Sequence, residues 1–544
     1  MATVVNFQGK NYIEPGSYAS TVYNPTSVVN VAEFGNVMII DTGLSLATVN
    51  GVSSEFAGGS GVKGALASGL KSVYGFTNYE DFLSFIGGGL VGDIANKIFT
   101  PLDGAAGAPK LYYVRAATTV PAVIDLTISS GNKLTLTCKN EGLCGNGIEV
   151  DNVLKVGYSA QIVAGEAAGK FKIVIYKGMY MGADESGEPY GPYSLEDSKP
   201  NLIAESGDLS TLQELYDWAR NSRVVLSHFN VEMSGSGSTS LSAVAKTLSS
   251  GGTTTYLNDN EYADVLEAIQ EMDITFFLTT NLNADSGAGV NAATNGKLFT
   301  HIKQTAKFTS HMFIAGGEED DDLFAASNSS KSIAEYYNSD QVVVVHGAPI
   351  VTRKDNNGTK QLHSIYLAAA IIGLNAGMAA QTPLTFKRVG YQSFAYDLKK
   401  REREAALQAG IMHVRNVSGY WCVNQGITTL QNNKKTIAED GQSFELSISL
   451  IKAQLNKELI LEGQIRFTGL TAAQASPESV KNFTETKLAS FVASPGADNL
   501  IISWKNVKVT AKNSDYFITY DFVPNVPVNK TFFVGNILDF VVTV

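Results

Sequence analysis

The chain has few cysteines and histidines and no arrangement of either that defines a site. Only 3 of its 544 residues are cysteines. They form no CxxC pair, and an odd count is not a disulfide framework, so Cys138, Cys144 and Cys422 are expected to be ordinary thiols in a reducing cytoplasm. The 6 histidines lack ligand spacing and are expected to be core or surface residues, not metal ligands.

Basic charge and long apolar runs are also scarce. With 41 Lys and Arg against 52 Asp and Glu, the formal net charge is −11, which argues against general binding of nucleic acid. The longest apolar helical stretch, residues 367–380, is interrupted by Asn375 and is shorter than the roughly 20 residues that span a bilayer. The amino terminus lacks the charge and apolar core of a secretory signal. These features predict a soluble protein without membrane insertion or a nucleic-acid partner.

Catalytic motifs are absent as intact patterns. Glycines 287 and 289 follow a predicted strand without the third glycine of a dinucleotide fingerprint, and "NGK" at 295–297 lacks the glycine spacing of a phosphate loop. Neither G-x-S-x-G nor HExxH occurs. The acidic run at 318–322 is either a hard-cation site or, as we favour, a solvated loop. The chain is therefore predicted to be no enzyme and to need no cofactor or metal.

The residues that are present describe a folded α/β protein of several domains. Hydrophobic residues make up 44% and charged residues 17% of the chain. "NVMIID" (36–41) and "KLYYVRAA" (110–117) are predicted strands, and a capping-box pattern at 77–80 opens a helix. Alternating strand patterns without helix signals from 118 to about 175 indicate a small all-β module. After it, helical and strand patterns alternate, with "RVVLSHF" (223–229) as one of the strands, which predicts a layered sheet covered by helices. The Ser/Gly-rich segment 234–252 is expected to be a mobile loop.

Both ends of the chain are unusual. Residues 1–30 are short apolar pieces broken by turn residues, and the final stretch "FFVGNILDFVVTV" (532–544) carries a single charge, on Asp539. An unpaired strand of this kind promotes aggregation. It must close a sheet in its own molecule or join a sheet in another, and the residues alone leave both possibilities open.

Several segments, read in order, resemble contractile tail sheath proteins of bacteriophages and related injection machines. The resemblance runs nearly end to end and departs from the family pattern at 383–385, where a Pro-Asn signature is degraded. It rests on "YIEPGSYASTVYNP", "VYGFTNYEDFLSFIGG", "KLYYVRAA", "NEGLCGNGIEV", "LSSGGTTTYLNDNEYADVLEAIQEMDITFF", "LHSIYLAAAIIGLNAGMAAQTPLTFKRV", "LQAGIMHVR" and "FVPNVPVNKTFFVGNILDF".

The resemblance implies a helical homo-oligomer of stacked rings around a tail tube protein, bounded by baseplate and tail terminator or neck proteins. Such a sheath stores energy in a metastable extended lattice and contracts to drive the tube through the host envelope. The implied location is the virion, after assembly in the cytoplasm of the host bacterium. Alternatives are the sheath of a non-viral injection system or bacteriocin-like particle, an α/β enzyme with an unrecognised site, and another self-assembling surface protein.

The resemblance also implies a division of the chain and a set of contact residues. Expected are an amino-terminal arm (1–30), an α/β core in two parts (31–117 and 196–350), an inserted outward-facing all-β domain (118–195), a tube-facing carboxy-terminal domain (351–525) and a carboxy-terminal arm (526–544). The inserted domain remains open to a role in host or glycan contact. The arms are expected to be donated to neighbouring subunits through Tyr18, Thr21, Val22, Tyr23, Phe532, Phe533, Val534, Ile537, Leu538, Phe540, Val541 and Val542.

A basic cluster is the second predicted contact. Lys399, Lys400, Arg401 and Arg403 lie in a helical pattern. Related sheaths place a positively charged part of the carboxy-terminal domain against an acidic tube, and these four residues are the candidates for that contact. The alternative is a solvated helix face.

Overall fold

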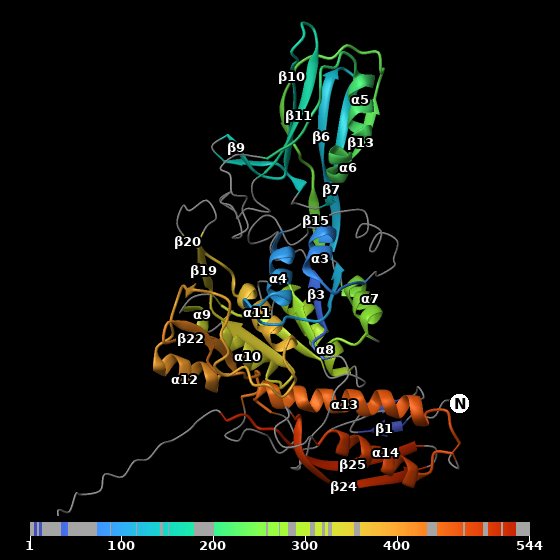
Figure 1. Cartoon of the computed structure of the whole chain (residues 1–544), viewed down its shortest axis with the longest axis vertical. Coiled ribbons are helices and arrows are strands. Elements are labelled where there is room, and N and C mark those ends of the chain that lie inside the picture. The colour runs from blue at the N-terminus through green and yellow to red at the C-terminus, as the bar shows by residue number, and fades with distance from the viewer. Residues whose placement is uncertain are drawn as a thin grey trace, which may run out of the picture.

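The computed structural model describes most of the chain outside the two ends. Described are residues 5–7, 10–12, 34–41, 73–86, 89–115, 117–141, 145–150, 152–178, 201–256, 259–270, 272–280, 290–304, 310–317, 321–324, 329–352, 359–431, 443–471, 474–492, 499–512 and 515–528. These residues form an elongated molecule, with a central α/β body between a β-rich domain and a smaller carboxy-terminal lobe (Figure 1). No helix in these ranges has the length and apolar character needed to cross a bilayer.

The body is built on an eight-stranded mixed sheet with the order β23-β22-β18-β17-β16-β3-β5-β4. The six inner strands are parallel, and the two edge strands are antiparallel to their neighbours. This sheet confirms the predicted α/β class and the predicted strands at 36–41 and 110–117. Its strands are β3 (Val37–Asp41), β4 (Tyr74–Phe76), β5 (Leu111–Arg115), β16 (Phe276–Thr279), β17 (His311–Ala315), β18 (Val342–His346), β22 (Ile411–Val417) and β23 (Tyr420–Val423).

Helices cover both faces of the sheet, because the inner strands are apolar on both sides. In β3, Val37 and Ile39 belong to one buried cluster and Met38 and Ile40 to the other. The first face carries α3 (Tyr79–Ile86), α4 (Gly89–Phe99) and α11 (Ser364–Ala376), and the second carries α7 (Asp259–Ile269), α8 (Val290–Gln304), α9 (Asp321–Phe324), α10 (Ser330–Tyr337) and α12 (Lys400–Gln408).

Helix α3 begins at Tyr79, one residue later than a cap at Thr77 predicts. Asn78, not Thr77, caps it: the Asn78 side-chain oxygen accepts a hydrogen bond of 2.9 Å from the backbone N–H of Asp81. The Asn78 amide in turn donates to the Asp81 carboxylate at 2.6 Å. The sequence pattern thus predicts the helix start correctly but its N-cap one residue too early, since Asn and Thr side chains both accept such hydrogen bonds.

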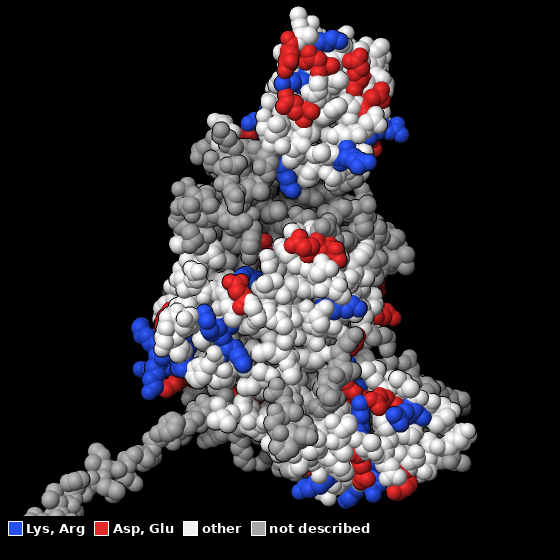
Figure 2. Space-filling model, viewed as in Figure 1, with Lys and Arg blue, Asp and Glu red and all other residues white. Residues whose placement is uncertain are grey.

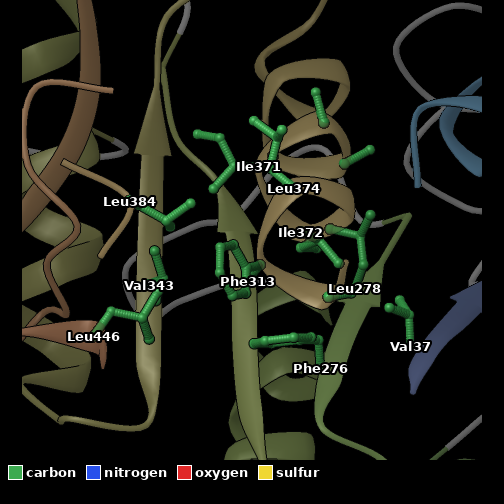
Figure 3. Packing of buried hydrophobic residues seen from close by; sticks show 14 of the residues in the cluster. Val37, Phe276, Leu278, Phe313, Val343, Ile371, Ile372, Leu374, Leu384 and Leu446 are labelled. Atoms are coloured by element: carbon green, nitrogen blue, oxygen red, sulfur yellow. The ribbon is translucent and has the colours of Figure 1, made fainter. Parts of the chain in front are cut away.

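Helix α11 is the centre of the body, because all of its residues are buried. In Figure 3, Phe276 and Phe313 of the sheet lie alongside Ile371 and Ile372 of this helix. Gly373 and Gly377 let the helix approach α4 and the chain that follows it. A Cβ atom on Gly377 would lie 1.9 Å from the carbonyl oxygen of Ala106. A buried helix is thus confirmed here, with bounds 364–376 instead of the predicted 367–380. Glycine is needed at position 377 because the backbone of another segment lies so close.

The β-rich domain is inserted between β5 and α7 and is larger than predicted. It consists of two four-stranded sheets, β12-β11-β10-β14 and β13-β7-β6-β15, a small β8–β9 hairpin and two helices around a separate buried cluster. Its elements are β6 (Ala117–Ser129), β7 (Asn132–Glu141), β8 (Ile148–Val150), β9 (Val153–Val156), β10 (Tyr158–Ala164), β11 (Phe171–Lys177), β12 (Asn201–Glu205), α5 (Leu212–Asn221), α6 (Arg223–His228), β13 (Phe229–Ser234), β14 (Val244–Leu248) and β15 (Thr253–Tyr256).

Three expectations about this region are wrong. The boundary at 195 falls inside the domain, because β13 pairs with β7 and β15 pairs with β6. The segment 223–228, expected as a strand of the core, is helix α6, where Ser222 accepts a hydrogen bond from the backbone N–H of Val225. The Ser/Gly-rich segment 234–252, expected as a mobile loop, contains β14, which pairs with β10. Long-range pairing overrides local composition here.

The predicted carboxy-terminal domain also begins too early. Residues 364–423 belong to the body, through α11, α12, β22 and β23. The separate lobe consists of α13 (Leu446–Phe467), α14 (Pro477–Ser490) and the antiparallel pair β24 (Ile501–Lys512) and β25 (Asp515–Pro524). A small sheet of β19 (Pro349–Thr352), β20 (Thr359–Gln361) and β21 (Ser393–Phe394) lies against the body, and β1 (Val5–Phe7) pairs with β2 (Lys10–Tyr12).

The contact between α11 and the chain after α4 predicts a strong steric effect. Gly377→Ala should lower the free energy of unfolding by roughly 2 kcal/mol or more, because backbone must move to admit the new methyl group. The matched control is Gly296→Ala in α8, where the nearest atom, the Tyr336 hydroxyl oxygen, would be 3.9 Å away. That variant should be neutral or more stable by about 0.5–1 kcal/mol. Thermal melts of both variants measure the difference, and equal stability would contradict the close contact.

Candidate interaction surfaces

The carboxyl edge of the central sheet is where α/β proteins commonly bind ligands, so its polar residues need an account. Asp41, at the end of β3, is fully buried. One of its carboxylate oxygens accepts a hydrogen bond of 2.9 Å from Tyr113, and the other accepts one of 3.0 Å from Thr280. The three side chains tie β3 to its two neighbours. We interpret this cluster as a structural clasp.

Buried titratable groups in the body and in the inserted domain serve packing as well. Within the described ranges, no group of three or more His, Cys, Asp or Glu side chains is arranged to hold a metal ion. Burial lowers the pKa of His413 to about 3 and raises the pKa of the Cys138 thiol to about 12. Both side chains therefore remain uncharged at neutral pH, as suits residues in a core.

A polar seam joins α13 to the amino-terminal edge of the sheet. The His311 Nε2 atom lies 2.8 Å from the Ser449 hydroxyl oxygen, and Ser449 donates a 2.9 Å hydrogen bond to the Asp340 carbonyl. Lys452 forms an ion pair with the Asp340 carboxylate, and both side chains are largely buried. Sequence reasoning missed this seam, because its members lie more than a hundred residues apart and each sits in an ordinary strand or helix pattern.

Helix α13 also carries the carboxy-terminal lobe. Lys457 pairs with Asp273 of the body at 2.6 Å, and Lys487 of α14 pairs with Glu458 of α13 at 2.9 Å. Glu462 is a second partner of Lys487. Removing one member of a buried ion pair is costly because the other charge remains without compensation. These pairs therefore fix the orientation of the lobe on the body.

The most exposed feature of the lobe is the β24–β25 ribbon. One face packs on the core through Ile501, Val507 and Phe522, whereas Ile502 and Ile518 are exposed. Among the described strands, no third strand pairs with either member of the ribbon. Both outer edges therefore present backbone N–H and C=O groups that can accept further strands.

The predicted arms cannot be placed on this ribbon directly. All twelve arm candidates, from Tyr18 to Tyr23 and from Phe532 to Val542, lie outside the described residues. Within the predicted amino-terminal arm, the described backbone forms the β1–β2 hairpin, in which Val5 pairs with Tyr12. The donation of the arms remains a prediction.

The predicted basic cluster lies on α12, at the surface of the body (Figure 2). Lys399 is the N-cap residue, and its backbone N–H donates a 2.6 Å hydrogen bond to Glu402, which lowers the pKa of that carboxyl group. Lys400 lies 3.9 Å from Glu404, and Arg401 is exposed. Arg403 instead turns back and donates to the Leu398 carbonyl. The structure thus presents three of the four cations to solvent, and their tube contact stays a prediction.

Comparison with known proteins gives one sequence relative and a structural likeness. No protein-family model matches the chain. Over 176 residues, 32% of this chain, it is 25% identical to the tail sheath protein of Bacillus phage SP01, a match that spans 29% of that relative's length. The crystal structure of a sheath tail protein from Desulfitobacterium hafniense has a TM-score of 0.54 and 14% identity, and the alignment covers 93% of this chain and 99% of that one. A sheath tail protein from Listeria innocua has a TM-score of 0.45, 13% identity and coverage of 91% and 96%.

The chain therefore has the fold of sheath tail proteins over nearly its whole length. The sequence relative and the Desulfitobacterium structure are both named as tail sheath proteins, the family that the sequence motifs resemble.

The polar seam makes stability depend on pH. Burial lowers the pKa of His311 to about 4, a shift that Asp340 opposes and Lys452 reinforces. Between the ordinary value of about 6.5 and 4, the unfolded chain binds a proton that the folded chain refuses, so stability falls as the pH drops through this window. The free energy of unfolding should fall by on the order of 3 kcal/mol from this group. In His311→Gln, which keeps a polar group near Ser449, denaturant titrations from pH 7 to 4 should show a flatter dependence; an unchanged slope would contradict the assignment.

Proposed function

We propose that this chain is the subunit of a contractile sheath, which polymerises helically around a tail tube and shortens from a metastable extended state to drive the tube through an envelope. Similarity to a phage tail sheath protein in sequence and to a sheath tail protein in fold supports the structural role. The observation that carries the proposal is the β24–β25 ribbon, with two edges that no other described strand covers. It is long, with 12 and 10 residues in its strands, and it stands apart from the central sheet.

Strand exchange between subunits fits this ribbon. A two-stranded sheet is marginal by itself, and additional strands complete its hydrogen bonds. The chain leaves β25 at Pro524 and continues into the apolar stretch 532–544, which supplies a strand of suitable composition. We propose that this stretch and the amino-terminal arm join the ribbons of neighbouring copies. Main-chain pairing of this kind keeps subunits connected while their bodies change orientation, and contacts that do not close on themselves generate helical filaments.

Deletion of residues 532–544 tests this role. The variant should stay folded, because none of the three described buried clusters includes these residues, yet it should no longer form tubes. Negative-stain electron microscopy measures assembly, and a circular dichroism melt reports on folding. Sleeves of normal length from the deletion variant would contradict strand donation while leaving the family assignment intact.

Helix α12 is the proposed tube contact. Its side chains at Lys399 and Lys400 are 77% and 84% exposed, so both can meet a partner. Exposed charges act over about 10 Å at 0.1 M salt, which makes such a contact sensitive to ionic strength. An acidic tube surface is the complementary partner.

Charge reversal on α12 provides a second test. Lys400→Glu with Arg401→Glu should weaken co-sedimentation with tube protein by about tenfold at low ionic strength, since charge complementarity becomes repulsion. The matched control is Arg220→Glu with Arg223→Glu, two exposed arginines of the inserted domain. The control should bind the tube normally. Equal binding by both double variants, or binding that ignores salt, would exclude α12 as the contact.

The particle type is proposed on narrower grounds. The sequence relative is a phage tail sheath protein, which favours a virion over a non-viral injection system or a bacteriocin-like particle. In a virion the sheath would extend from baseplate to neck. The inserted domain, which projects from the body at the end away from the carboxy-terminal lobe, is proposed to face outward (Figure 1).

A further inference from the structure

A second cationic surface lies on the sheet beside α12. β22 and β23 form an antiparallel pair in which Arg415 is directly opposite Cys422. The segment that follows Leu384 runs along the free edge of β23, and its Arg388 is bridged to the same Cys422. Residues paired across antiparallel strands point to the same face. Arg388, Cys422 and Arg415 therefore form a row across three adjacent segments.

Two aromatic rings support the row. The Arg388 guanidinium carbon lies 3.8 Å from the centre of the Tyr420 ring, and that of Arg415 lies 4.4 Å from the centre of the Phe386 ring. Stacking on an aromatic face holds a guanidinium in one plane and leaves its edge available for hydrogen bonds. Phe386 and Tyr420 are themselves 48% and 51% exposed, so the rings and the cations together form an accessible surface.

The backbone at Phe386 has an unusual conformation. Its φ is 60°, a left-handed conformation that is rare for a bulky residue. Such a conformation costs of order 1–3 kcal/mol and is found mainly where the surroundings or function demand it. Here the Phe386 N–H donates a 2.8 Å hydrogen bond to the Val423 carbonyl, and the half-exposed ring lies beneath the Arg415 guanidinium.

Among the described residues, neither arginine has an anionic partner. The ion pairs between described side chains near this surface belong to Lys399, Lys400 and Arg403, and neither Arg388 nor Arg415 joins one. The Arg415 Nε atom is buried without a hydrogen-bond partner. Partial burial lowers the pKa of Arg415, and nearby Arg403 lowers it further. In a chain with net charge −11, such a group of uncompensated cations favours an external anion.

We infer that Arg388, stacked on Tyr420, and Arg415, stacked on Phe386, form a binding row for the carboxylates of an acidic protein segment. Guanidinium edges match carboxylates in paired hydrogen bonds, and aromatic residues and arginine are enriched where protein interfaces gain most energy. A nucleic acid fits less well, because the acidic chain offers no broad basic face to a continuous polyanion. This inference goes beyond the proposed sheath function, since it requires neither the tube nor the arms.

A peptide-binding experiment on the full-length chain tests the row. A short fluorescein-labelled poly-L-glutamate peptide is titrated with protein at low ionic strength, and fluorescence anisotropy reports binding. Arg388→Gln with Arg415→Gln should weaken the affinity by about tenfold, because two charge-assisted contacts are lost. Arg220→Gln with Arg223→Gln removes the same charge from the inserted domain and should change the affinity by less than about twofold.

Phe386→Gly distinguishes the loss of the aromatic ring beneath Arg415 from a loss of stability. Glycine adopts the positive φ without strain, so this variant should melt no lower than the parent chain but bind the peptide about threefold more weakly. If the double arginine variant fails to fold, the peptide affinity of Phe386→Gly still tests the inference. Equal weakening by the two double variants, or full binding by Phe386→Gly, would overturn the inference. Tighter binding of single-stranded DNA of equal charge through the same residues would replace the carboxylate partner with a nucleic acid.

Discussion

Backbone hydrogen bonding at an open sheet edge is the constraint on which the rest of this molecule depends. The central sheet satisfies its inner strands internally and covers both faces with helices. The β24–β25 ribbon does not: among the described strands it has no third member. An exposed edge of this length is either a liability or a docking site. If the chain polymerises, as we propose, a docking site accounts for both the ribbon and the apolar end of the chain.

The body is built to act as one rigid unit. α11 is buried along its full length, and the contacts of Gly373 and Gly377 with α4 and the following chain leave little room for sliding. The lobe is attached differently, through α13 and its ion pairs with Asp340 and Asp273. Directional pairs of buried charges fix one orientation more sharply than apolar packing does, at the cost of sensitivity to pH and to the loss of either partner.

Figure 2 shows one group of Lys and Arg side chains over α12, along with others over the carboxy-terminal lobe and the inserted domain. The surface on α12 and the surface on the adjacent sheet differ in chemistry. On α12, Lys399 and Lys400 are exposed point charges, each close to a glutamate one turn away. On the sheet, Arg388 and Arg415 stack on aromatic rings and have no such partner among the described residues. The first suits a contact that forms and breaks with ionic strength, and the second suits a specific anchor.

The sequence by itself determined the α/β class, the buried strand at 36–41 and the buried helix around Leu367, because apolar periodicity is a local property. The inserted domain predicted from the sequence is too short, because the Ser/Gly-rich composition of 234–252 does not indicate strand β14. The predicted boundary at 351 divides the body, because β22 and β23 belong to the central sheet. Only the tertiary structure brought His311 to Ser449 and set Arg388 and Arg415 on either side of Cys422. Those contacts depend on strand register and on pairing between distant segments, which no local pattern encodes.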